Sequence, residues 1–166
     1  MTPAVEAASN AIQLARKGQS PYFEEGPIGD MAREDVVCGL PQWVALKRGW
    51  VYLAQNDAWP GLYKIGCTRR GVQQRMTSLN RTGLITEWVP LVYWQVYDAP
   101  GLEARVHKQC EAFQHSFEMF KASPQELTAQ AEAVFERDRQ AILTNLKELL
   151  HVEALAALFT VARHLC

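Results

Sequence analysis

Four side chains in this 166-residue sequence have the types and the order that phosphodiester hydrolysis would need. Tyr52, Lys64 and Arg75 follow one another closely, and Glu103 comes after one further apolar segment. A tyrosine or a lysine can take or relay the proton of an attacking water, and an arginine can neutralise charge on phosphate oxygens. A glutamate can hold a divalent metal ion. None of the four residues is diagnostic alone. Whether they can form one site depends on the strands and helices that position them.

A β-hairpin is predicted to carry Tyr52 and Lys64. Two short runs rich in β-branched and aromatic residues, about 50–55 and 62–67, flank the turn-forming segment 55–61. In the second run, alternation places Lys64 and Gly66 on one face of the strand. A glycine at a strand end leaves room for a ligand or for another part of the backbone.

A helix over residues 70–80 would carry Arg75. Its apolar residues Val72, Met76 and Leu79 recur at helical spacing and predict a buried stripe. Arg75 lies at the edge of this stripe. From there its aliphatic stem can pack while its guanidinium group reaches a cleft.

The next strand and helix would bring Glu103. Residues 88–97 are apolar on both faces, which predicts a central strand. The following helix, about 101–115, places Glu103 and His107 as i,i+4 neighbours. Two interpretations of His107 remain open: a group that orients Glu103 or touches the leaving phosphate, and a half-buried helix histidine without a role in chemistry.

The charge distribution is informative locally rather than globally. The net charge is −1, which gives no general signal for nucleic acid. No acidic residue lies between Asp57 and Glu87, however, and five basic residues do: Lys64, Arg69, Arg70, Arg75 and Arg81. Such a patch can dock an anion, although a solvated surface is the ordinary alternative.

The order of these motifs resembles that of the GIY-YIG nuclease superfamily. Trp50-Val51-Tyr52 stands for the first tripeptide and Lys64-Ile65-Gly66 for the second. Arg75 looks like the helix arginine of the family, and Glu103 like its metal-binding glutamate. The resemblance is closest to the phage and bacterial branch with Lys-Ile-Gly as its second motif, in which the glutamate helix continues to a histidine. Glu118-Met-Phe120 is similar to the Glu-x-Phe of that branch.

The resemblance implies an α+β fold with a small three-stranded antiparallel sheet flanked by helices. We expect this domain over residues 49–123, an N-terminal helical extension over 1–48 and a C-terminal helical region over 124–166. The extension would hold a helix at 4–17 and a second helix from Asp30 that breaks at 39–41; residues 42–48 would be a short helix or extended. Residues 124–166 would form one very long helix or two helices that meet near His151.

The resemblance also implies a Mg²⁺-dependent (or Mn²⁺-dependent) DNA endonuclease with one ion at Glu103. Water would lose its proton through Tyr52 with help from Lys64, Arg75 would stabilise the phosphorane, and His107 would complete the catalytic set. Three further arginines would contact the DNA backbone: Arg69, Arg70 and Arg81.

Two departures from the family pattern keep alternatives open. Trp50 replaces the first glycine, and Lys64 replaces the second tyrosine, so Lys64 is either a base with a lowered pKa or a fixed cation. The alternatives are a catalytically inactive module that binds DNA or protein, and a toxin or defence effector with the same chemistry.

The remaining composition predicts a cytoplasmic protein. Four widely spaced cysteines form no CxxC or Cys/His ligand pattern, so neither a zinc site nor a disulfide framework is indicated. No signal peptide and no membrane span is apparent. The terminal helices could pack on the domain, form a homodimer or bind a protein partner.

Overall fold

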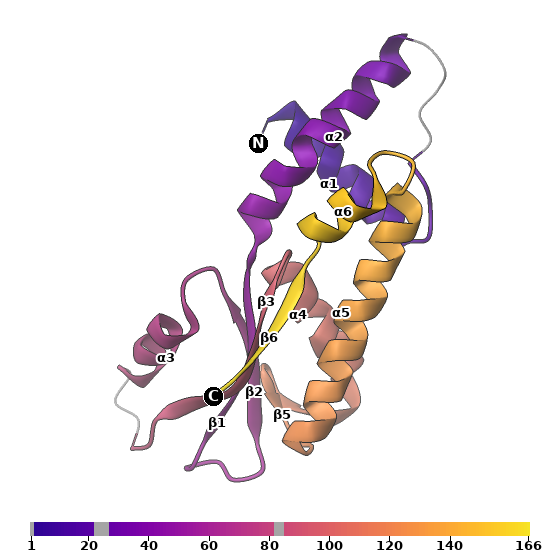
Figure 1. Cartoon of the computed structure of the whole chain (residues 1–166). Helices are drawn as coiled ribbons and strands as arrows, with labels where there is room; N and C mark the ends of the chain where they lie inside the picture. Colours follow the sequence, from indigo (N-terminus) through magenta and orange to yellow (C-terminus); the bar gives the residue numbers. More distant parts are fainter. Residues whose placement is uncertain (1, 22–26, 82–84) are drawn as a thin grey trace. The chain divides into compact units, whose positions relative to one another are not determined.

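The computed structural model describes residues 2–21, 27–81 and 85–166, with the backbone alone over 27–32 (Figure 1). The chain divides into two compact units. One comprises residues 1–46 and 136–160, and the other comprises residues 47–135 and 161–166. All predicted catalytic residues lie in the second unit. The predicted division at residues 48 and 123 stays a prediction.

The second unit is built on an antiparallel sheet of six strands among the described residues, in the order β4-β5-β2-β1-β3-β6. The long strands are β1 (Gly49–Asn56), β2 (Tyr63–Thr68) and β3 (Trp88–Val96). The short edge strands are β4 (Gln114–Ser116), β5 (Met119–Phe120) and β6 (Val161–Leu165). The α+β class is therefore confirmed, whereas the expected count of three strands is too low.

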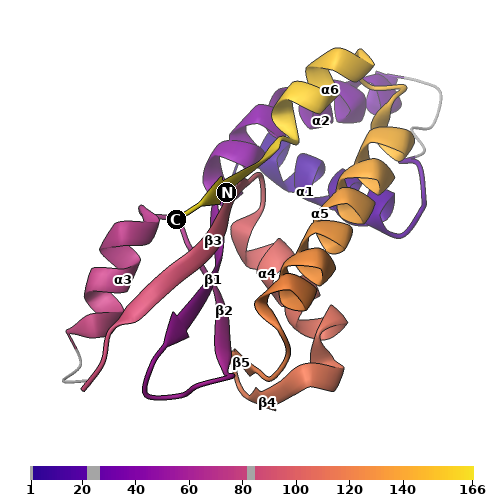
Figure 2. The same cartoon turned by 60° about the horizontal axis from the view of Figure 1, so that its bottom comes forward.

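Helices cover both faces of this sheet. Helix α3 (Val72–Asn80) lies on one face, and α4 (Ala99–Gln109) and the start of α5 (Pro124–Leu146) lie on the other (Figure 2). On the α3 face, Val72 and Met76 pack against Tyr52 and Ala54 of β1. On the opposite face, Trp94 of β3 makes an edge-to-face contact with Phe135 of α5 at 5.4 Å. Because both faces are covered, the central strands are apolar on both sides.

The hairpin and central strand form as the sequence predicts. β1 pairs antiparallel with β2, so that Tyr52 lies opposite Gly66 and Ala54 opposite Lys64. β1 also pairs with β3, with a shift in register after Leu53. β3 is an interior strand because β6 pairs with its other edge.

The C-terminal region differs from the prediction in its last residues. Helix α5 ends at Leu146, and α6 (Val152–Leu158) begins after the N-cap His151, as the two-helix alternative had it. Residues 161–165 are a strand rather than a helix. The apolar residues of this segment fit the period of a helix and that of a strand. The segment forms a strand because the free edge of β3 supplies hydrogen-bond partners for its backbone.

The first unit contains α1 (Pro3–Arg16), α2 (Pro27–Lys47), the end of α5 and α6. The predicted break at residues 39–41 is wrong, because α2 runs through Pro41 to Lys47. Gly39 serves helix packing instead: a Cβ there would lie 1.9 Å from the carbonyl oxygen of Ala4 in α1. Asp30 also lies inside α2, which starts at Pro27, and so it does not cap the helix.

Candidate nuclease site

The open edge of β2 brings the predicted catalytic residues together. β5 pairs with β2 only at Tyr63 and Lys64, so the outer edge of β2 has no strand partner beyond this point among the described residues. Side chains from the α3 face and from α4 meet around this edge.

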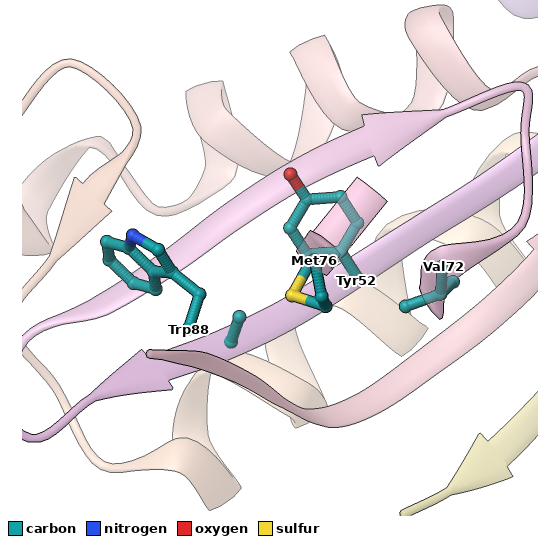
Figure 3. Close-up of a cluster of buried hydrophobic side chains, with 5 residues drawn as sticks. Tyr52, Val72, Met76 and Trp88 are labelled. Atoms are coloured by element: carbon teal, nitrogen blue, oxygen red, sulfur yellow. The ribbon is translucent and has the colours of Figure 1, made fainter. Parts of the chain in front are cut away.

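Tyr52 is fully buried, and its ring leans from β1 across β2. A Cβ atom at Gly66 would lie 2.5 Å from the Tyr52 hydroxyl oxygen and 2.7 Å from Cζ. The second-motif glycine therefore leaves room for the tyrosine of the first motif, rather than for a ligand. Figure 3 shows the Tyr52 ring beside Met76, with its hydroxyl directed away from the other labelled side chains.

Arg75 extends from α3 to the Tyr52 hydroxyl. Its Nε donates a hydrogen bond to the Tyr52 oxygen at 3.4 Å, and its side chain is half-buried, as its position beside the apolar stripe predicts. Its two terminal nitrogens make no hydrogen bond within the described part of the chain. They remain available to phosphate oxygens, which a guanidinium group can bind in a bidentate manner.

Glu103 approaches from α4. Asp98 caps this helix by accepting a hydrogen bond from the Gly101 amide at 3.1 Å. One turn later, Glu103 Oε2 accepts a hydrogen bond from the Cys67 thiol at 3.4 Å. Cys67 was not among the predicted site residues. Its place in β2, next to Gly66, is the signal that would have found it.

The Cys67 thiol is a donor because it stays protonated. Burial, together with the charge of Glu103 and the hydrogen bond to it, raises the pKa of Cys67 to about 12. A neutral thiol can therefore orient the carboxylate without competing with it for protons at neutral pH.

Lys64 faces Glu103 across a cleft of about 620 Å³, which is also lined by His107, Phe117 and Glu118. Lys64 forms an ion pair with Glu118 of the β4–β5 hairpin. Burial lowers the pKa of Lys64, the charge of Arg75 lowers it further, and Glu103 raises it. Glu118 favours the charged ammonium whenever the ion pair is formed.

His107 holds α4 against the edge of β2. Its Nε2 lies 3.0 Å from the carbonyl oxygen of Ile65, and a carbonyl can only accept, so Nε2 carries a proton. The Ile65 amide in turn donates to the carbonyl oxygen of Glu118 at 3.1 Å. His107 Nε2 is 3.9 Å from Glu103 Oε1. These contacts tie α4 to the edge of β2, and the catalytic role predicted for His107 stays a prediction.

The charges of these residues act on one another. Burial raises the pKa of Tyr52 above 10.0, Arg75 partly reverses the shift, and Glu103 adds to it. The Arg75 and Glu103 charges therefore reach both Tyr52 and Lys64. The phenol is accordingly neutral at physiological pH.

Glu103 is the residue that could hold a metal ion. Within the described residues, no group of three or more histidines, cysteines or acids could form a metal site. One carboxylate, completed by water and substrate phosphate, suits Mg²⁺ or Mn²⁺, whereas zinc sites use three or four protein ligands. Glu103 Oε1 makes no hydrogen bond with a described residue. The donor set therefore fits one hard cation.

The three predicted DNA-binding arginines do not form one patch. Arg69 and Arg70 are exposed between β2 and α3, close to the strand that carries Lys64. Arg81 is exposed at the opposite end of α3, where it lines a separate groove with Asn80 and Trp88.

A comparison with family models matches residues 49–143 to the T5orf172 domain. The chain belongs to the T5orf172 domain family. This is a GIY-YIG-related phage domain. The matched range contains Tyr52, Lys64, Arg75, Glu103 and His107, together with Cys67 and Glu118. No curated protein and no solved structure matches the chain. Over the described residues of this T5orf172 protein, no helix is long and apolar enough to cross a membrane.

Proposed function

We propose that this T5orf172 domain is a Mg²⁺-dependent DNA endonuclease that hydrolyses phosphodiester bonds. The observation that supports the proposal is the meeting of two groups at the open edge of β2. One is the hydrogen-bonded pair of Arg75 and Tyr52, from the α3 face. The other is Glu103, held from α4 by Cys67, with Lys64 across the cleft.

Arg75 binds the scissile phosphate. Its Nε is occupied by Tyr52, so its terminal nitrogens take the non-bridging oxygens and stabilise the charge that develops on them. Glu103 would hold the Mg²⁺ ion, which would supply Lewis-acid polarisation of a phosphoryl oxygen. Arg69 and Arg70 bind flanking phosphates, which gives salt-dependent affinity with little sequence information.

Lys64 takes the proton of the attacking water, and the buried Tyr52 hydroxyl acts on the site through Arg75, whose guanidinium group it positions. Tyr52 is poorly suited to be the base because burial raises its pKa, so its phenol stays protonated. Lys64 is better suited because burial and Arg75 lower its pKa. The ion pair with Glu118 keeps a proton on Lys64, so the amine acts as a base only after that pair opens and the proton is lost.

Supercoiled plasmid and Mg²⁺ provide the test. Glu103→Gln and Arg75→Ala should each lower the nicking rate by about 100-fold or more, since each removes a group that acts on the transition state. Glu111→Gln, which neutralises an exposed acid in the turn after α4, is the matched control and should nick at the wild-type rate. Wild-type protein that never nicks, or variants that all nick equally, would show the enzyme proposal to be wrong.

The alternative is a binding module without catalysis. The observation that favours it is the Lys64–Glu118 ion pair, which occupies the lysine that stands where the family has its second tyrosine. Such a module would bind DNA with the same affinity in Mg²⁺ and in EDTA and would cleave in neither. A toxin or defence effector would share the nuclease chemistry and differ in its biological context.

A further inference from the structure

Phe117, at the rim of the cleft between Lys64 and Glu103, is one of the most exposed large apolar residues that the structure describes. Its side chain is 91% exposed. It lies at the tip of the β4–β5 hairpin and lines the cleft together with Lys64 and Glu103. A phenyl ring that contributes nothing to a core and stands beside a proposed reaction centre calls for an explanation.

The backbone at Phe117 makes the residue choice costly. Ser116 pairs with Met119, so the hairpin turn has Phe117 and Glu118 at its centre. Phe117 has φ +41°, and among the described residues it is the only one other than glycine with a positive φ. Positive φ at the first central position alone is the pattern of a type II′ turn, where glycine is preferred. Hairpin folding therefore favours glycine at position 117, and not an aromatic residue.

The hairpin also fixes the ring relative to the catalytic groups. The Glu118 carbonyl oxygen accepts from the Ile65 amide of β2 at 3.1 Å, and the Glu118 carboxylate pairs with Lys64. The Gln114 side chain donates to the carbonyl oxygen of Phe117 itself. The ring thus projects from a turn that is tied to the strand of the second motif.

We infer that Phe117 stacks on a nucleobase of the bound strand next to the cleavage site. The inference rests on the proposed nuclease function and adds a substrate class: DNA in which this base is unpaired. A strand with a phosphate in this cleft carries its neighbouring bases past the rim, where the exposed aromatic ring of Phe117 supplies a stacking surface for any base. A base inside a closed duplex is already stacked on both sides and cannot accept the ring.

The test compares Phe117→Gly with wild type on three probes in EDTA, where binding is measured without cleavage. The probes are single-stranded oligothymidylate, a base-free phosphodiester strand of equal length, and a relaxed, covalently closed circular duplex. Glycine suits the turn, so the variant should melt at or above the wild-type temperature. Its affinity for oligothymidylate should fall about 10-fold, and its affinity for the other two probes should change less than twofold.

Controls separate stacking from other roles of the ring. Phe117→Trp should keep the wild-type preference for oligothymidylate over the base-free strand. Leu165→Ala removes another exposed apolar side chain of this unit, 70% exposed, and should leave all three affinities unchanged.

If Phe117→Gly lowers the affinity for all three probes equally, or for none of them, the stacking assignment is overturned and the nuclease proposal stands. No loss on any probe is also the result expected if Phe117 contacts a protein partner. Wild-type protein that binds none of the probes and does not nick plasmid would overturn both proposals.

Discussion

Gly66→Ala should damage the site through Tyr52 more than it damages the fold. The added methyl carbon would lie 2.5 Å from the Tyr52 hydroxyl oxygen and 2.7 Å from Cζ. Normal contact needs about 3.4 Å, so the hydroxyl must move by about 0.9 Å. Tyr52 is fully buried against Met76, which limits the ways in which the ring can yield.

Two consequences differ in size. Overpacking of this kind costs about 1–3 kcal/mol of unfolding free energy, which corresponds to a loss of about 3–10 °C in melting temperature. The Arg75–Tyr52 hydrogen bond is already 3.4 Å long, so the displacement breaks it. A displacement of about 1 Å in a positioning group lowers catalysis by about 100-fold.

Nicking rates and melting temperatures of Gly66→Ala are measured beside Gly71→Ser, the matched control. Gly71 is the N-cap of α3, its added Cβ would meet no atom within 4 Å, and serine suits that position. The control should keep wild-type activity and stability.

A double-mutant cycle with Tyr52→Phe then tests the cause. If Gly66→Ala acts by displacing the hydroxyl, it should cost little further activity once that hydroxyl is absent. The reasoning is refuted if Gly66→Ala nicks at the wild-type rate, or if its cost in activity is the same in the Tyr52→Phe background.

Three further outcomes are expected. Cys67 should be alkylated far more slowly than the exposed Cys38 at pH 8, because a pKa of about 12 leaves on the order of 0.01% of the Cys67 thiol as thiolate. Peptide mass spectrometry of protein treated with iodoacetamide measures the two rates. Equal rates would contradict the Glu103 contact. Tyr52 should make the protein less stable in alkali. Because the pKa of Tyr52 is raised in the folded state, its contribution to the free energy of unfolding is complete below pH 10. That contribution is lost as the pH rises through the folded-state pKa. Above pH 10, the melting temperature of Tyr52→Phe should therefore fall less steeply with pH than that of the wild type. Asp138→Ala should lower the free energy of unfolding, measured by chemical denaturation, by about 3–5 kcal/mol, because it removes the bidentate partner of the buried Arg16 guanidinium group, which lies 2.9 Å away. A loss below about 1 kcal/mol would show that the pair is not buried in solution.

The sequence predicted most reliably where local signals agreed with one another. The hairpin had two β-rich runs around a turn-forming loop, and β1 and β2 form an antiparallel pair at these positions. Helix α3 had a stripe and an arginine at its edge, and both lie as expected. The Ser123 side chain caps α5 by accepting from the Glu126 amide at 3.1 Å, and the two residues have the spacing of a capping box.

Prediction failed where the partner lay far away in the chain. Strands β4 and β5 are too short for any periodicity to reveal, and β6 exists because β3 offers a free edge. Pro41 reads locally as a helix breaker, yet α2 continues through it. Packing of α1 on Gly39 outweighs the local cost of glycine and proline.

The sequence by itself determined which residues could form this site: Tyr52, Lys64, Arg75 and Glu103 were identified from type, order and the elements around them. Only the tertiary structure decided how they meet. It showed that Gly66 accommodates the Tyr52 ring, that Cys67 donates to Glu103, and that Glu118 pairs with Lys64. These contacts join separate strands and a helix across the edge of a sheet. Local periodicity describes one element at a time, and so it carries no information about such an edge.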